Sequence, residues 1–129
     1  MQTRRVGSLE VSVVGLGCNN FGWRIDAEAS AKVVDAAIES GITFFDTADR
    51  YGKGQSEDFL GRALGSRRDQ IILATKFGME MEKGQQGASP RYIPKAIEAL
   101  APAENRSDRS LPIASARSED ADCRYPGRD

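Results

Sequence analysis

The chain has 129 residues, the ordinary size of one domain, with a hydrophobic content of 40% and a charged content of 29%. Its formal net charge of −1 gives no electrostatic reason for a nucleic acid or an anionic membrane as partner. No apolar run approaches the roughly 20 residues of a membrane-spanning helix, and no histidine is present for a site that needs imidazole.

Cysteine usage and the N-terminus predict the compartment. Cys18 and Cys123 are too few and too far apart for a disulfide framework, and the CxxC spacing of a metal site is absent. Residues 1–10 carry two arginines, but no apolar segment of a signal peptide follows them. We therefore expect a cytoplasmic protein without a metal site.

The N-terminal stretch predicts a β-hairpin followed by a strand. Residues 3–6 and 9–13 are β-prone, and Gly7-Ser8 between them is a two-residue turn signal. Residues 13–18 then form an apolar run with glycines. This pattern is typical of a buried strand whose backbone is approached closely.

Two helices are predicted from apolar residues at helical spacing. The first covers residues 27–40, with Asp26 as its N-cap and Gly41 just beyond its end. The second covers residues 55–64, with Ser56 as its N-cap. Each helix is followed by an apolar run, so helices and strands are predicted to alternate.

The apolar runs at residues 42–47 and 71–76 lack polar alternation, which indicates strands buried on both faces. A polar loop at 77–88 leads to Ser89-Pro90, where a third helix is predicted to begin and to run to about residue 100. This β-α-β-α-β-α order predicts an α/β fold with a parallel sheet and right-handed crossovers. Such units build either an open doubly wound sheet or part of a TIM barrel, which takes roughly 250 residues to close.

The composition changes after the third predicted helix. Residues 101–129 are rich in Arg, Ser, Asp and Ala and have neither a helical nor a strand period. A weakly apolar, charged segment does not offset the entropy lost on ordering it. We therefore predict a folded domain over residues 1–100 and an irregular tail over residues 101–129.

Three polar residues follow the predicted strands where parallel α/β folds place their chemistry. Asp46 ends one strand, Tyr51 lies in the loop after it, and Lys76 ends the next. A tyrosine acts as an acid near neutral pH only if its pKa falls from about 10, and a neighbouring ammonium favours the phenolate. Taken singly, however, the same residues suit a strand-end cap, a surface aromatic and a solvated lysine.

Four blocks of sequence resemble the aldo-keto reductases. They are GLG at 15–17, GITFFDTADRYG at 41–52, QSE at 55–57 and ATKFG at 74–78. The resemblance extends over about residues 3–99. It implies a TIM barrel whose base is closed by an N-terminal hairpin, and reduction of a small carbonyl substrate, or oxidation of an alcohol, by hydride transfer with NADPH.

The resemblance also implies roles for particular residues. Tyr51 matches the family's proton donor, Lys76 the lysine that lowers the pKa of that donor, and Asp46 the aspartate paired with the lysine. The residues implied to contact the cofactor are Gly17, Cys18, Asn19 and Asp46. The family's fourth catalytic residue, a histidine after the fourth strand, has no counterpart here, and nothing in the sequence predicts an oligomeric state.

The tail can be re-read one nucleotide out of frame. With permitted codons, residues 103–116 become LKTDRIDLYQLHQP, and residues 117–128 become DPKTPIADTLGA. Both strings resemble the family's continuation, and the codons of Ala114 and Ser115 supply the missing histidine. We therefore hypothesise a frameshift, in the gene or in its reading, near residues 99–102. DNA sequence without LxQLH in any shifted frame would refute it.

Two hypotheses of different classes follow. The first is an NADP-dependent carbonyl reductase lineage. The second is a non-catalytic fragment, because an unclosed barrel leaves open strand edges and exposed apolar faces. An independent nucleotide-binding module is disfavoured, since no phosphate-binding loop is present.

Overall fold

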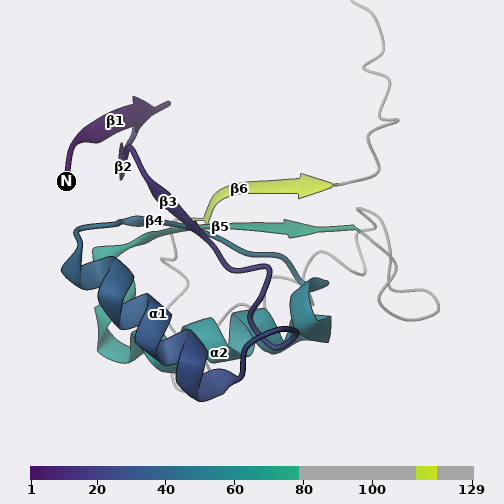
Figure 1. The fold of residues 1–129 in the computed structure, drawn as a ribbon. Helices are drawn as coiled ribbons and strands as arrows, with labels where there is room; N and C mark the ends of the chain where they lie inside the picture. Colours follow the sequence, from purple (N-terminus) through teal and green to yellow (C-terminus); the bar gives the residue numbers. More distant parts are fainter. Residues whose placement is uncertain (79–112, 119–129) are drawn as a thin grey trace, which may run out of the picture.

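A computed structural model describes residues 1–78 and the backbone of residues 113–118. In this part, a β-hairpin stands beside a four-stranded sheet with helices on one face (Figure 1). The strands are β1 (Thr3–Val6), β2 (Leu9–Ser12), β3 (Gly15–Gly17), β4 (Phe44–Asp46), β5 (Ile72–Phe77) and β6 (Ile113–Ser118). The helices are α1 (Ala27–Glu39) and α2 (Gln55–Leu64), with 3-10 turns at Tyr51–Gly54 and Gly65–Gln70.

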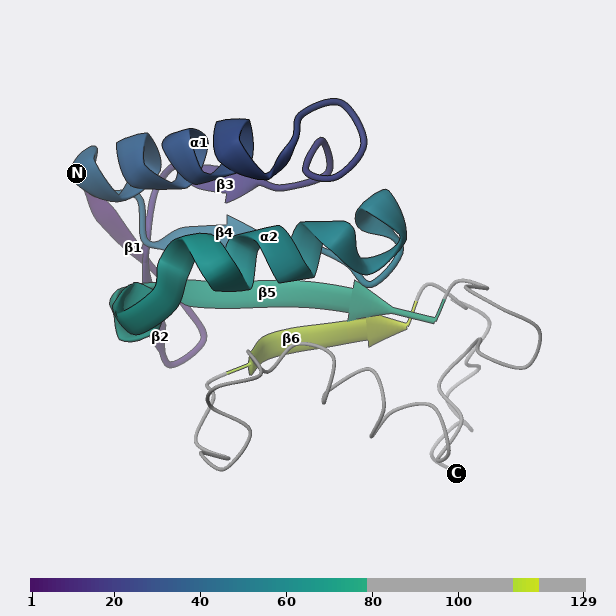
Figure 2. The same ribbon diagram turned by 90° about the horizontal axis from the view of Figure 1, so that it is seen from below.

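The main sheet is parallel throughout, which confirms the predicted α/β arrangement. Its strand order is β3-β4-β5-β6, and every neighbouring pair runs in the same direction. Gly17 lies opposite Asp46, and Asp46 lies opposite Ala74. Helices α1 and α2 lie side by side along the same face of the sheet (Figure 2). The carboxyl ends of β3, β4 and β5 therefore meet at one edge.

Local sequence signals account for the helix boundaries. Asp26 Oδ1 accepts the backbone N–H of Ala29 at 2.8 Å, which caps α1 as predicted. Gly41, with φ of +78°, follows the helix end. The predicted N-cap of α2 is wrong: Gly54 holds that position, and Ser56 lies inside the first turn. Ser56 is fully buried, and its hydroxyl bonds residues outside the helix instead of capping it.

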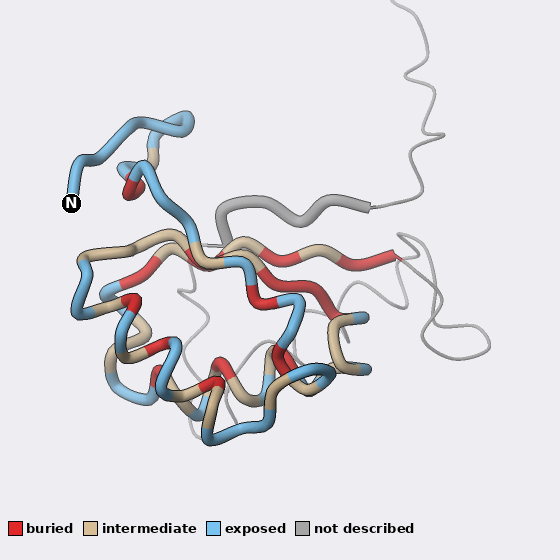
Figure 3. Tube along the Cα trace, in the orientation of Figure 1, coloured by how far each residue is buried: buried red, intermediate tan, exposed pale blue. Residues whose placement is uncertain are grey.

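The core lies between the two helices and the sheet. Buried residues lie along this layer, and the hairpin is mostly exposed (Figure 3). They include Cys18, Phe21, Val34, Ala37, Phe45, Leu60, Leu64, Ile71 and Leu73. The expectation of strands buried on both faces is wrong for the described part, because burial alternates along β5. Leu73, Thr75 and Phe77 are buried, whereas the residues between them are only half-buried.

The hairpin is attached to the sheet through one reciprocal pair. The backbone N–H of Ser12 donates to Thr43 Oγ1 at 3.0 Å, and the backbone N–H of Thr43 donates to Ser12 Oγ at 2.9 Å. Thr43 directly precedes β4. The pair ties the hairpin to the amino end of β4, away from the edge where the strands end.

Strand β6 corrects the expectation of an irregular tail at six residues. Ile113–Ser118 pairs in parallel with β5, and Lys76 lies opposite Arg117. A strand can form in a charged segment because an open sheet edge offers it a row of unpaired backbone groups. The predicted third helix and the domain boundary at residue 100 lie outside the described residues.

Candidate active site at the carboxyl ends of the strands

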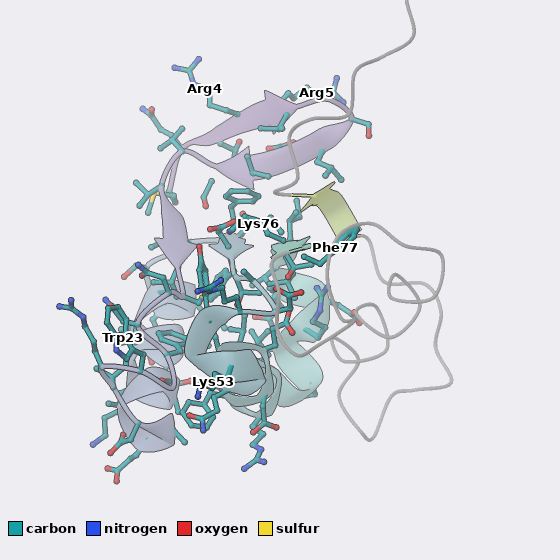
Figure 4. The ribbon with its side chains drawn as sticks, turned by 90° about the vertical axis from the view of Figure 1, so that its right-hand side faces the viewer. Arg4, Arg5, Trp23, Lys53, Lys76 and Phe77 are labelled. Carbon is teal, nitrogen blue, oxygen red and sulfur yellow. The ribbon has the colours of Figure 1, made fainter. Side chains whose placement is uncertain are left out.

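Lys76 is the centre of the strand-end cluster (Figure 4). Its Nζ lies 2.8 Å from both Asp46 Oδ1 and Asp46 Oδ2, and 2.9 Å from the backbone oxygen of Thr47. An ammonium has three N–H groups, so all of its donors have an acceptor. The lysine is thereby fixed in one position between the ends of β4 and β5.

Tyr51 completes the cluster from the loop after β4. Lys76 Nζ lies 5.0 Å from the centroid of the Tyr51 ring, within the range of a cation–π contact. The Tyr51 backbone N–H donates to the Ala48 oxygen at 3.1 Å, which holds the start of the loop. The structure thus brings Asp46, Tyr51 and Lys76 together, while their catalytic roles stay a prediction.

Charge reinforces this arrangement. Burial lowers the pKa of Lys76, but the hydrogen bond to Asp46 and the interaction with Tyr51 together raise that pKa above its ordinary value. Lys76 therefore carries its positive charge at neutral pH. The structure thus places a fixed cation 5.0 Å from the centroid of the Tyr51 ring.

Cys18 does not reach the open edge of the site. Its side chain is fully buried in the core, and its backbone N–H donates to the Asp46 oxygen at 2.8 Å. Burial, followed by the charge of Asp46 and opposed by Lys76, raises the pKa of the thiol to about 12. Cys18 is thus an inert core residue with no exposed atom for a ligand.

The other residues of the predicted cofactor set do lie in the open. Gly17 and Asn19 are exposed, and Gly17 ends β3 directly opposite Asp46. A Cβ placed on Gly17 would meet no atom within 4 Å. The surface beside Asp46 is therefore free of side-chain obstruction from β3.

Sequence reasoning missed a second layer of polar residues behind the cluster, in which Ser56 and Thr75 are buried and Glu57 is half-buried. Ser56 and Glu57 stand next to each other in the first turn of α2, and Thr75 immediately precedes Lys76. Thr75 Oγ1 donates to Glu57 Oε1 at 2.8 Å. Two features of the sequence could have indicated this layer. Thr75 is a polar residue within a mainly apolar strand, and Ser56-Glu57 are polar residues in the first turn of a helix that packs on the sheet.

The environment of Glu57 disfavours its negative charge and raises its pKa. Burial raises its pKa from 4.5 to about 7, the hydrogen bond from Thr75 lowers it, and the negative charge of Asp49 raises it further. Glu57 therefore changes its charge near neutral pH at a position directly behind the strand that carries Lys76.

Two loops of the site touch through glycines. A Cβ on Gly52 would lie 2.7 Å from the backbone oxygen of Phe21 and 3.0 Å from the Cα of Gly22. Gly52, Lys53 and Gly54 all have positive φ, with values of 56°, 56° and 88°. This left-handed turn directly follows Tyr51. It allows the backbone of the β4–α2 loop to pack closely against the backbone of the β3–α1 loop.

We expect Gly52→Ala to destabilise the fold by about 1–2 kcal/mol more than Gly7→Ala does. Both glycines have φ near +60°, at 56° and 62°, but a Cβ on Gly7 would meet nothing within 4 Å. The difference therefore isolates the steric cost of the loop contact. Urea unfolding of the two variants measures it, and equal losses would refute the close packing at Gly52.

Trp23 projects outward from the β3–α1 loop (Figure 4). It is 67% exposed, and the Arg24 guanidinium carbon lies 4.5 Å from the centroid of its ring. Among residues 1–78 there is no group of histidine, cysteine or acidic side chains placed to hold a metal ion. Within the same part of the chain, no helix has the length and apolar character to cross a membrane.

Comparison with known proteins gives a consistent result. The model of the Aldo/keto reductase family matches residues 13–105. The uncharacterized oxidoreductase YqkF of Bacillus subtilis is 39% identical over 104 residues, which cover 76% of this chain and 33% of that protein. The aldo-keto reductase yakc of Schizosaccharomyces pombe, whose name includes NADP(+), is 37% identical over 105 residues, covering 74% and 31%.

Comparison with solved structures also finds an aldo-keto reductase. The holo form of the aldo-keto reductase AKR11C1 from Bacillus halodurans superposes with a TM-score of 0.69 and 39% identity, covering 78% of this chain and 35% of that one. The likeness confirms the prediction that the sheet is part of a TIM barrel. The chain spans about a third of the length of the curated relatives named above.

Proposed function

Because the chain belongs to the aldo/keto reductase family, we propose that its strand-end site serves the NADP-dependent reduction of aldehydes or ketones to alcohols, or the reverse reaction. The observation that carries the proposal is the Lys76 ammonium, held by Asp46 at 2.8 Å and placed 5.0 Å from the Tyr51 ring centroid. A cation locked beside a phenol is an arrangement for moving a proton.

In the proposed reaction, Tyr51 handles the proton. Its hydroxyl donates to the carbonyl oxygen as negative charge develops there, and in the reverse direction the phenolate accepts the proton of the alcohol. Lys76 stabilises the phenolate through its charge. Asp46 keeps the ammonium in place, because both carboxylate oxygens accept from Nζ. A small carbonyl or alcohol is the proposed substrate, and the cytoplasm is the proposed compartment.

The residues present fit a nicotinamide cofactor. When bound, NADP(H) would supply or accept the hydride. Gly17 leaves open space opposite Asp46, so a flat ring has room beside the Asp46–Lys76 pair. Asn19 is exposed and offers a side-chain amide at the same edge. We propose that Gly17, Asn19 and Asp46 contact the cofactor, and that Cys18 contributes only by supporting this edge from below.

We also propose that the residues beyond about 100 are encoded out of frame. The family match ends at residue 105, close to the proposed shift near residues 99–102. If the frame is restored, the histidine encoded at positions 114 and 115 would fall in the segment of β6, which lies next to β5 where a fourth barrel strand belongs.

A second candidate is that the 129-residue chain is a non-catalytic fragment. Two observations favour it: the chain covers only 33% of YqkF, and in the described sheet β3 and β6 each have a strand on one side only. Exposed strand edges promote association rather than catalysis. The two candidates are compatible if the first describes the lineage and the second this form of the chain.

The experiment sequences the DNA across codons 99–102 and then compares the 129-residue chain with the frame-restored protein. Binding of NADPH is followed by fluorescence, and turnover by the carbonyl-dependent loss of NADPH absorbance. We expect turnover only from the frame-restored protein. Turnover by the 129-residue chain would refute the fragment candidate. Absence of carbonyl-dependent turnover in a folded, frame-restored protein would refute the reductase proposal.

A further inference from the structure

Ser56 connects two of the strand ends from behind the site. Its Oγ donates to the backbone oxygen of Cys18 at 2.8 Å and lies 2.9 Å from Thr47 Oγ1. All three residues are fully buried. The link therefore joins the end of β3, the end of β4 and the first turn of α2 without access to water.

Counting hydrogens gives the link a direction. Ser56 has one hydroxyl hydrogen, and the Cys18 oxygen receives it, so Thr47 must be the donor in the Thr47–Ser56 pair. The Thr47 backbone N–H donates to the Ala74 oxygen at 2.9 Å, and its backbone oxygen accepts from Lys76 Nζ at 2.9 Å. Each polar group of Thr47 thus has a partner.

This chain of bonds ends at the Lys76 ammonium. Nζ donates to both carboxylate oxygens of Asp46 and to the Thr47 peptide oxygen, and it also interacts with the Tyr51 side chain. The orientation of that peptide depends on where the Thr47 side chain is anchored. We propose that Ser56 is a positioning residue, whose buried hydroxyl holds Thr47 so that its carbonyl locks Lys76 beside Tyr51.

Ordinary helix capping does not explain Ser56. A capping serine bonds the backbone of its own helix, whereas Ser56 bonds two residues outside α2. Ser30 offers the contrast within this chain. It is also fully buried in a helix, but its Oγ donates at 2.7 Å to the oxygen of Asp26, four residues earlier. Ser30 therefore provides a matched control for the loss of a buried helix hydroxyl.

The test follows the Lys76 ammonium directly and does not need turnover. Two-dimensional 1H–15N spectra of lysine ammonium groups report how fast the Nζ protons exchange with water, and Lys76→Arg assigns the signal. We expect Ser56→Ala to speed the exchange at Lys76 by about tenfold, as for loss of a charge-assisted hydrogen bond, and Ser30→Ala to leave it unchanged. An unchanged Lys76 signal in folded Ser56→Ala would overturn the proposal.

Thr47 supplies a second route to the same answer. Thr47→Ala should reproduce the faster exchange, Thr47→Ser should restore slow exchange because it keeps the hydroxyl, and the double variant should be no faster than either single one. If Ser56→Ala and Thr47→Ala both fail to fold while Ser30→Ala folds, the link is a folding requirement and the positioning role is overturned.

The inference rests on the proposed function only in taking Lys76 and Tyr51 as the reacting pair. The two ideas fail separately. Faster ammonium exchange in Ser56→Ala without any reductase activity in the frame-restored protein would leave the positioning intact and refute the reaction. Unchanged Lys76 exchange in Ser56→Ala, together with reductase activity in the frame-restored protein, would refute the positioning role and leave the proposed reaction intact.

Discussion

Replacing Tyr51 by phenylalanine should lower carbonyl reduction by the frame-restored protein by about 10²–10⁴-fold, the range for loss of a positioned general acid. The substitution keeps the ring that faces the Lys76 ammonium at 5.0 Å, so the surrounding structure has no reason to move. Only the hydroxyl is lost. Steady-state turnover with NADPH and a simple aldehyde measures the loss, and fluorescence titration should give an unchanged affinity for NADPH.

A lysine pair separates the proton step from general damage. Lys76→Met should also reduce turnover strongly, because the phenolate loses the cation that stabilises it. Lys53→Met is the matched control, since Lys53 is exposed and lies two residues after Tyr51.

Turnover of Tyr51→Phe within about threefold of the parent protein would exclude Tyr51 as the acid. Loss of NADPH affinity in the same variant would point to a structural role instead.

The free energy of unfolding should fall between about pH 4.5 and pH 7 because of Glu57. Its pKa in the folded state is raised from 4.5 to about 7, mainly by burial, so the folded protein holds a proton that the unfolded chain releases. For this sign of shift, the contribution is most favourable below pH 4.5. It declines as the pH rises to about 7, by roughly 2–3 kcal/mol in total.

Glu57→Gln tests this expectation without removing the acceptor, because the amide oxygen can still receive the Thr75 hydroxyl hydrogen bond. The variant should match the parent protein near pH 4 and exceed its stability near pH 8 by about 2–3 kcal/mol. Urea unfolding at both pH values gives the comparison. Glu28→Gln is the control, because the Glu28 side chain is 79% exposed in its pair with Lys32. Parallel pH profiles for the parent and Glu57→Gln would contradict the assignment.

Features that depend on neighbouring residues in the chain were predictable. The structure has α2 at Gln55–Leu64 and α1 at Ala27–Glu39, against predictions of 55–64 and 27–40. Helical spacing of apolar residues and a capping aspartate are local signals, and they act before any tertiary contact forms. The hairpin turn at Gly7-Ser8 was predictable for the same reason.

Features that depend on which elements meet were harder to predict. Ser56 was assigned to a cap, although its hydroxyl bonds two strand ends distant in sequence. The tail was expected to be irregular, although β6 forms where β5 offers an edge. In each case the partner lies far along the chain, and no local pattern encodes it.

By itself, the sequence determined the family, the parallel α/β class and the three residues around which the chemistry is proposed, because family motifs and strand ends are readable in one dimension. Only the tertiary structure decided how Asp46, Thr47 and Tyr51 surround Lys76. It also decided that Ser56, Glu57 and Thr75 form a polar layer behind them, with Ser56 and Thr75 buried. The reason is physical: burial and hydrogen-bond partners arise only when β3, β4, β5 and α2 pack together, and they set both charge and geometry.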